Sequence, residues 1–149
     1  MATHGLPAWP WAETETANLP PAEGLVLEGM RRWAMAARIG APTLPALWPP
    51  FIAEDAGPAA RPLDGLLRAA AEGGLPQLGC PLCPRLTGAE AELLLALALV
   101  QRGCRARALG LLLRHLPLTA AQAAMTEAVR LGLALSQAGL LLRNPLRLR

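Results

Sequence analysis

The stretch "TGAEAELLLALALVQRG", residues 87–103, decides the fold of this chain. Thr87 and Glu90 have the three-residue spacing of a capping box, in which two side chains bond the free backbone N–H groups at a helix start. The residues that follow are apolar on nearly every side, which is typical of a helix buried inside a bundle. Gly103 ends the stretch. We therefore predict a buried central helix over 88–102, around which the rest of the chain packs.

The composition of the whole chain favours an all-α fold. Hydrophobic residues make up 53% of the 149 residues, mainly as leucine and alanine, which favour helices. Aromatic residues, which favour strands, make up 3%. A chain of this length suits one domain with a single core. The prediction is a single helical domain over 1–149, built as a compact bundle of about five helices.

Helices are expected on both sides of the central one. Apolar spacing and helix-ending glycines and prolines place them at 21–39, 63–72 and 105–116. A last helix follows, with Thr119 and Gln122 as a second capping box. We expect the C-terminal helices to form antiparallel helical hairpins.

The last predicted helix carries small side chains at strict four-residue spacing, namely Ala120, Ala124, Ala128, Gly132 and Ser136. Such a ribbon lets another helix approach closely. The partner helix lies either within this chain or, in a homodimer, in a second copy of it.

Two segments lack a helical pattern. Residues 1–19 are expected to be an irregular N-terminal arm. Residues 40–62 contain six prolines, which interrupt regular helices, so we predict a proline-rich extended strap lying on the bundle.

Charge separates the two halves of the chain. Residues 1–75 carry five arginines and eight acidic residues, a net charge of −3, whereas residues 76–149 carry nine arginines and three acidic residues, a net charge of +6. The arginines are interrupted by leucines, whereas a nucleic-acid-binding face is densely basic and interleaved with aromatic platforms. We therefore expect no nucleic-acid partner.

The sequence also favours a cytoplasmic protein that does not enter a membrane. The longest unbroken apolar run, over 93–100, has eight residues, and a helix that spans a bilayer needs about 20. The start, "MATHGLPAWPWAETET", lacks the cationic and apolar segments of a secretory signal. Three cysteines, an odd number, then indicate reduced thiols and not a disulfide framework.

The segment "GCPLCPRL", residues 79–86, is where chemistry would be expected. Its prolines first of all predict a stiff turn that needs no cofactor. The alternative is a zinc site, because thiolates and imidazoles are zinc ligands. If the helix over 105–116 runs antiparallel to the central one, His115 returns toward Cys80 and Cys83, and these three would bind the metal with His4 or water.

A second alternative is thiol chemistry. "CPLC" resembles the dithiol motif of glutaredoxin-like proteins, and this resemblance implies that Cys80 is the attacking thiol. No strand pattern lies within 50 residues of the motif, although that family places it after a strand.

The preferred functional interpretation is a small non-enzymatic interaction or accessory protein that binds a protein partner or a second copy of itself. Interfaces favour tryptophan and arginine. Trp9 and Trp11 in the N-terminal arm, and a helix face with Arg107, Leu111 and Arg114, are therefore the candidate contact surfaces. The metal-binding or thiol-active protein remains the alternative.

Overall fold

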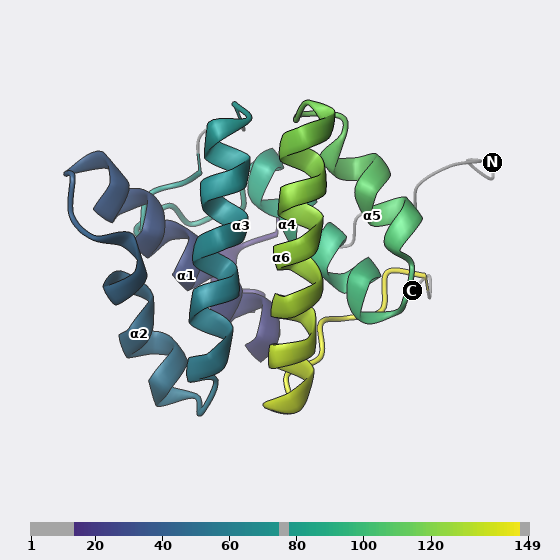
Figure 1. The fold of residues 1–149 in the computed structure, drawn as a ribbon. Helices are drawn as coiled ribbons and strands as arrows, with labels where there is room; N and C mark the ends of the chain where they lie inside the picture. Colours follow the sequence, from purple (N-terminus) through teal and green to yellow (C-terminus); the bar gives the residue numbers. More distant parts are fainter. Residues whose placement is uncertain (1–13, 75–77, 147–149) are drawn as a thin grey trace.

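The computed structural model describes residues 14–74 and 78–146, and these residues form six α-helices and two short 3-10 helices. Figure 1 shows their arrangement. In chain order they are η1 (Thr16–Asn18), α1 (Pro21–Arg38), α2 (Thr43–Ala53), η2 (Gly57–Ala59), α3 (Ala60–Glu72), α4 (Gly88–Gln101), α5 (Arg105–Leu112) and α6 (Leu118–Gln137). Within the described residues there is no strand, and the all-α prediction is confirmed.

The predicted central helix is present as α4. Its capping box forms as expected, since the Glu90 N–H donates to the Thr87 hydroxyl and the Thr87 N–H donates to the Glu90 carboxylate. Every residue over 93–100 is buried. Helices α1, α5 and α6 all pack against α4, so its apolar surface is covered from several sides.

The small side chains of α6 pack against other helices of the same chain. Helices α3 and α6 lie side by side in Figure 1, and Ala124 and Ala128 on α6 are buried. At the end of α3, a Cβ on Gly73 would lie 2.8 Å from that of Ala120. At the other end of the stripe, a Cβ on Gly132 would lie 3.3 Å from a side-chain atom of Val100 on α4. The stripe therefore serves close internal packing.

The predicted proline-rich strap over 40–62 is wrong, because α2 occupies its middle. Pro42 precedes this helix and Pro45 lies in its first turn, where a backbone N–H has no partner inside the helix anyway. Pro49 and Pro50 do lie inside α2, where each removes one backbone hydrogen bond. The part of the chain that the structure describes therefore contains six α-helices, where about five were expected.

Burial and a polar anchor hold α2 in place despite its prolines. Leu47, Pro50 and Phe51 are buried against the core. The Asp64 carboxylate on α3 accepts hydrogen bonds from the Thr43 hydroxyl at 2.6 Å and from the Trp33 indole at 2.8 Å. These bonds join α1, α2 and α3 at one point.

The second predicted capping box, Thr119 with Gln122, is also wrong. Helix α6 begins at Leu118, and Pro117 takes the N-cap position with extended backbone and no side-chain cap. Both residues of the predicted box therefore lie one or more positions inside the helix, past the place where a cap acts.

None of the described helices combines the length and the hydropathy that crossing a bilayer would require.

Candidate functional site

The cysteine turn, residues 79–83, leads into the capping box of α4. The Cys83 N–H donates to the Cys80 carbonyl at 3.1 Å, which closes a turn with Pro81 at its second position. The Cys80 N–H donates to the Cys83 sulfur at 3.3 Å, and the two sulfurs lie 2.9 Å apart. A turn is thus formed as expected, and it brings both thiols together at a partly exposed position.

A buried ion pair between α1 and α4 supports this turn. The Arg31 guanidinium donates from Nε to one oxygen of the Glu90 carboxylate at 2.9 Å and from Nη2 to the other at 3.0 Å. The two side chains are 4% and 0% exposed, respectively. Such a two-point pair fixes both position and orientation.

The same two side chains also bond the backbone on both sides of the cysteines. Arg31 donates to the Cys83 carbonyl at 2.6 Å and to the Arg85 carbonyl at 2.9 Å. Glu90 accepts from the Gly79 N–H and the Thr87 N–H, each at 2.9 Å. The ion pair therefore acts as a frame that positions the cysteine turn from within the core.

The electrostatics of the frame favour its charged form. Burial by itself would raise the pKa of the Glu90 carboxyl, but the hydrogen bonds from Arg31, Thr87 and Gly79 outweigh burial and leave the pKa below its usual value. The hydrogen bond from the Cys83 side chain lowers the pKa of the Cys80 thiol, and backbone N–H groups and the nearby Arg31 charge lower it further.

The structure does not bring His115 to the two cysteines. The His115 ring instead pairs with the Glu92 carboxylate, which also lies 3.7 Å from the Arg114 guanidinium. Within residues 14–74 and 78–146, no group of three or more histidine, cysteine, aspartate or glutamate side chains could hold a metal ion. The expected metal cluster of Cys80, Cys83 and His115 is therefore corrected, while His4 lies outside the described residues.

The predicted contact surface on α5 is corrected in part. Leu111 is 2% exposed and belongs to the core, because it faces inward from α5. Arg107 and Arg114 are exposed, and Arg114 belongs to the ion pair with Glu92. Trp9 and Trp11 lie outside the described residues.

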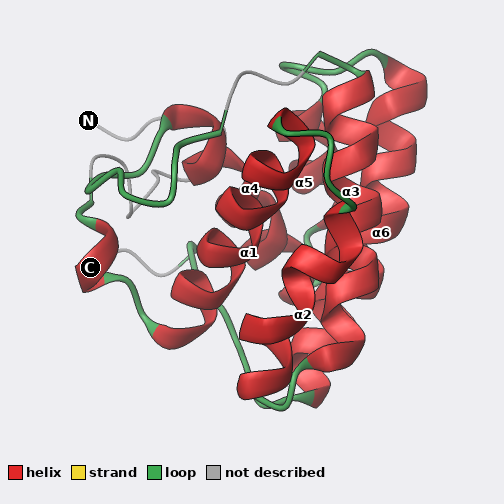
Figure 2. Cartoon of the chain, turned by 90° about the vertical axis from the view of Figure 1, so that its left-hand side faces the viewer, coloured by secondary structure: helices red, strands yellow, loops and turns green. Residues whose placement is uncertain are grey.

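Figure 2 shows α1 and α2 from the side of the molecule on which they lie in Figure 1. Side chains of these two helices line an open groove of about 780 Å³. We call it the α1–α2 groove. Pro81 of the cysteine turn and Thr16 complete its lining. The remaining lining residues are Gly24, Leu27, Glu28, Arg31, Arg32, Met35, Ala36, Ile39, Ala41, Pro42, Pro45, Ala46 and Pro49.

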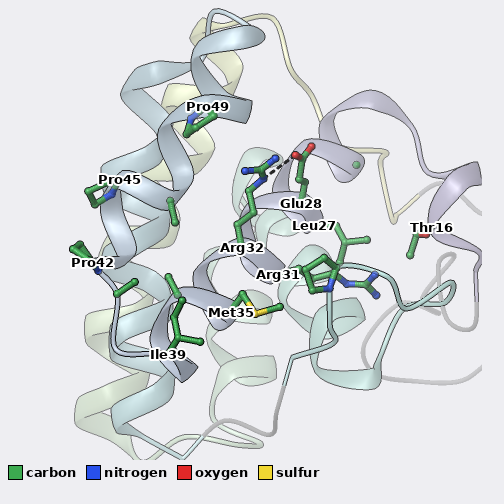
Figure 3. A pocket seen from close by; sticks show the side chains of 15 residues that line it. Thr16, Leu27, Glu28, Arg31, Arg32, Met35, Ile39, Pro42, Pro45 and Pro49 are labelled. Carbon is green, nitrogen blue, oxygen red and sulfur yellow. Dashed lines mark hydrogen bonds and ion pairs between the residues drawn. The ribbon is translucent and has the colours of Figure 1, made fainter.

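The groove walls come from one face of each helix. Figure 3 shows Pro45 and Pro49 along α2, and Pro42 just before it, opposite the side chains of α1. Met35 is 39% exposed and Ile39 is 72% exposed, although both are apolar. The groove therefore presents to solvent the apolar side chains of Met35, Ile39 and the three prolines, whereas the charged side chains of Glu28 and Arg32 line it farther along α1.

Sequence reasoning missed both the groove and Arg31. The groove depends on α2, which the prolines concealed, and Arg31 lies 59 residues from Glu90 in the chain. The capping box itself could have indicated that Glu90 pairs with an arginine. A capping box uses one oxygen of its glutamate and leaves the other oxygen free. The second oxygen of the buried Glu90 needed another donor, and the three arginines on the helix over 21–39 were candidates.

In comparisons with protein families, with curated proteins and with solved structures, nothing matched this chain. Its site is therefore interpreted from its own geometry.

Proposed function

We propose that this chain is a protein–protein interaction module that binds an amphipathic helix of a partner protein in the α1–α2 groove. The observation that carries the proposal is the exposure of apolar side chains, above all Met35 and Ile39, along a groove of about 780 Å³. Contiguous exposed apolar surface in a folded domain is typical of an interaction site.

The dimensions of the groove suit a helix of moderate length. One wall extends from Gly24 on α1 to Ile39, the C-cap residue just past the end of this helix. At about 1.5 Å per residue this wall is roughly 22 Å long, which matches a partner helix of about 15 residues. Helices that bind in such grooves do so through apolar residues spaced three and four apart.

The backbone chemistry of the walls favours a helix over an extended peptide. Both walls are helices, whose backbone groups are mostly bonded internally, and the three wall prolines have no N–H to offer. An extended peptide would find few backbone partners here and would leave its own groups unsatisfied. A helical partner bonds its own backbone and needs the groove for its apolar side chains alone.

The charges in the groove are already paired. Arg31 makes four hydrogen bonds, two to Glu90 and one to each of two backbone carbonyls, and Arg32 donates to Glu28 at 2.9 Å. The groove therefore offers little free positive charge to a phosphate or a carboxylate. Recognition rests on apolar side chains, with polar contacts at the rim.

Selection of 15- to 20-residue peptides from a displayed library against the full chain tests the proposal. We expect helical binders whose affinity falls about tenfold or more with Met35→Arg, because a buried charge replaces a buried apolar contact. Leu133→Arg is the matched control, since Leu133 is 59% exposed on α6 and outside the groove. Failure to select a helical peptide, or peptides that bind the Met35→Arg variant as well as the parent, contradicts the proposal.

A further inference from the structure

The cysteine turn has the geometry of a dithiol that can close into a disulfide. Its backbone hydrogen bond from Cys83 to Cys80 defines a turn whose end Cα atoms lie within about 7 Å, and disulfides span about 4.4–6.8 Å between Cα atoms. The sulfurs are 2.9 Å apart. They need to approach by roughly 0.9 Å to reach the bonded length of about 2.05 Å.

We propose that Cys80 and Cys83 form a thiol–disulfide exchange site that reduces a small-molecule disulfide and becomes an internal disulfide. This inference goes beyond the proposed interaction function and does not depend on what binds in the groove. It rests on the paired sulfurs, their partial exposure and the frame that holds the turn.

The surroundings assign the attacking role to Cys80. The Cys83 side chain, the N–H groups of Leu82 and Cys83, and the Arg31 charge all stabilise negative charge on the Cys80 sulfur. The thiolate is the nucleophile in exchange. Leu82 beside it is 91% exposed, so an approaching disulfide meets little protein around the tip of the turn.

The exchange proceeds in two displacements. The Cys80 thiolate attacks one sulfur of the external disulfide, forms a mixed disulfide with it and releases the other half as a thiolate, which takes a proton from water. Cys83 then loses its proton to water, attacks the Cys80 sulfur and releases the second half as a thiolate. Two protein thiols are oxidised to one disulfide, and one external disulfide is reduced to two thiols.

The frame is compatible with both states of the dithiol. Arg31 and Glu90 bond backbone atoms of Gly79, Cys83, Arg85 and Thr87, and none of these bonds uses a sulfur. Closing the disulfide therefore leaves the supporting hydrogen bonds in place. Arg31 is a positioning residue here, because it holds the turn and does not itself react.

The test exposes the reduced full chain to excess glutathione disulfide, followed by alkylation and mass spectrometry of its peptides. We expect loss of two hydrogens from the chain and a peptide that joins Cys80 to Cys83. Cys104→Ser is the matched control and should behave as the parent. Cys83→Ser should stop at glutathione bound to Cys80, and Cys80→Ser should form mixed disulfide at least about tenfold more slowly.

Reactivity of the unaltered chain provides a measurement that needs no variant. We expect iodoacetamide to modify Cys80 at least about fivefold faster than Cys104 at neutral pH. The proposal is overturned if glutathione disulfide produces no bond between Cys80 and Cys83, or if Cys80 reacts no faster than Cys104. It is also overturned if the two sulfurs bind added zinc and the chain then stays reduced.

Discussion

Arg31 joins two helices and the backbone of the segment that holds the cysteines. It lies on α1 but bonds Glu90 of α4 and the carbonyls of Cys83 and Arg85. A buried ion pair is often replaceable by apolar residues of similar size, because desolvation offsets its attraction. Here the pair also satisfies backbone groups that no apolar side chain could satisfy, so its replacement has a different consequence.

We expect Arg31→Met and Glu90→Leu each to lower the free energy of unfolding by about 3–5 kcal/mol, because each leaves a buried charge unpaired. The double variant should remain about 2 kcal/mol or more below the parent, since the backbone groups that the pair bonded also lose their partners. Urea unfolding monitored by circular dichroism measures these values. Arg32→Met is the control, with an expected loss under about 1 kcal/mol, because its ion pair is exposed. A double variant as stable as the parent contradicts the role of the pair as a frame.

Glu23 on α1 differs from Glu90 in the direction of its pKa shift, because burial outweighs the hydrogen bonds and charges that act on Glu23. Its side chain is fully buried, one carboxylate oxygen accepts the Arg143 N–H at 2.8 Å, and the other has no hydrogen-bond partner among residues 14–74 and 78–146. Burial raises the pKa of Glu23, and the Arg143 N–H and the charges of Arg143 and Arg102 offset this in part. Between the unfolded and folded pKa values the folded chain holds a proton that the unfolded chain has lost. The contribution of Glu23 to stability therefore falls as the pH rises through that window.

Glu23→Gln should accordingly stabilise the chain at pH 7, by about 1 kcal/mol, because a neutral amide replaces a buried carboxylate. The gain should shrink as the pH falls through that window and should level off below about 4.5, where the parent's carboxyl is protonated in both states. Thermal or urea unfolding of both proteins from pH 3.5 to 8 gives the difference curve. A difference that does not change with pH would show that Glu23 contributes through its shape alone. Glu28→Gln, an exposed position on the same helix, is the control.

At the scale of elements, the sequence predicted helices well where local signals agree with burial. Helix α1 was expected over 21–39 and observed over Pro21–Arg38, with Gly40 at a positive φ of 72° just beyond it. The capping box of α4 was found because its two residues are three apart. The prediction for α2 was wrong because of its prolines. The free-energy cost of a proline depends on its position within a helix and on the packing that compensates for it. Neither the position of the helix start nor that packing was evident from the sequence.

Close packing of α1 against α2 and α3 predicts an unequal response at two glycines of α1. A Cβ on Gly29 would lie 2.7 Å from Leu63 and 2.8 Å from Phe51, both fully buried. Gly29→Ala should therefore destabilise the chain by about 1–2 kcal/mol, as overpacking outweighs the better helix propensity of alanine. Gly24→Ala is the matched control, because nothing lies within 4 Å of its Cβ, and it should stabilise by up to about 1 kcal/mol. Equal effects in urea unfolding would contradict the close approach at Gly29.

At the scale of the whole molecule, the candidate sites arise where distant segments meet. The cysteine turn was recognisable as a sequence motif, but its frame joins α1 to α4, and the groove joins α1, α2 and Pro81. Pairings of this kind depend on how helices pack, which periodicity does not reveal. The error for His115 has the same origin, since the ring pairs with Glu92 and not with the cysteines.

The central claim is that the α1–α2 groove binds an apolar helix, and methionine methyl NMR tests it most directly. The chain has four methionines. Met35 lines the groove, whereas Met125 lies on α6 and does not line it. With the full chain labelled at its methionine methyl groups and saturated with a selected helical peptide, we expect the Met35 resonance to shift and the Met125 resonance to stay in place. A bound peptide that shifts Met125 and leaves Met35 unchanged would contradict the account.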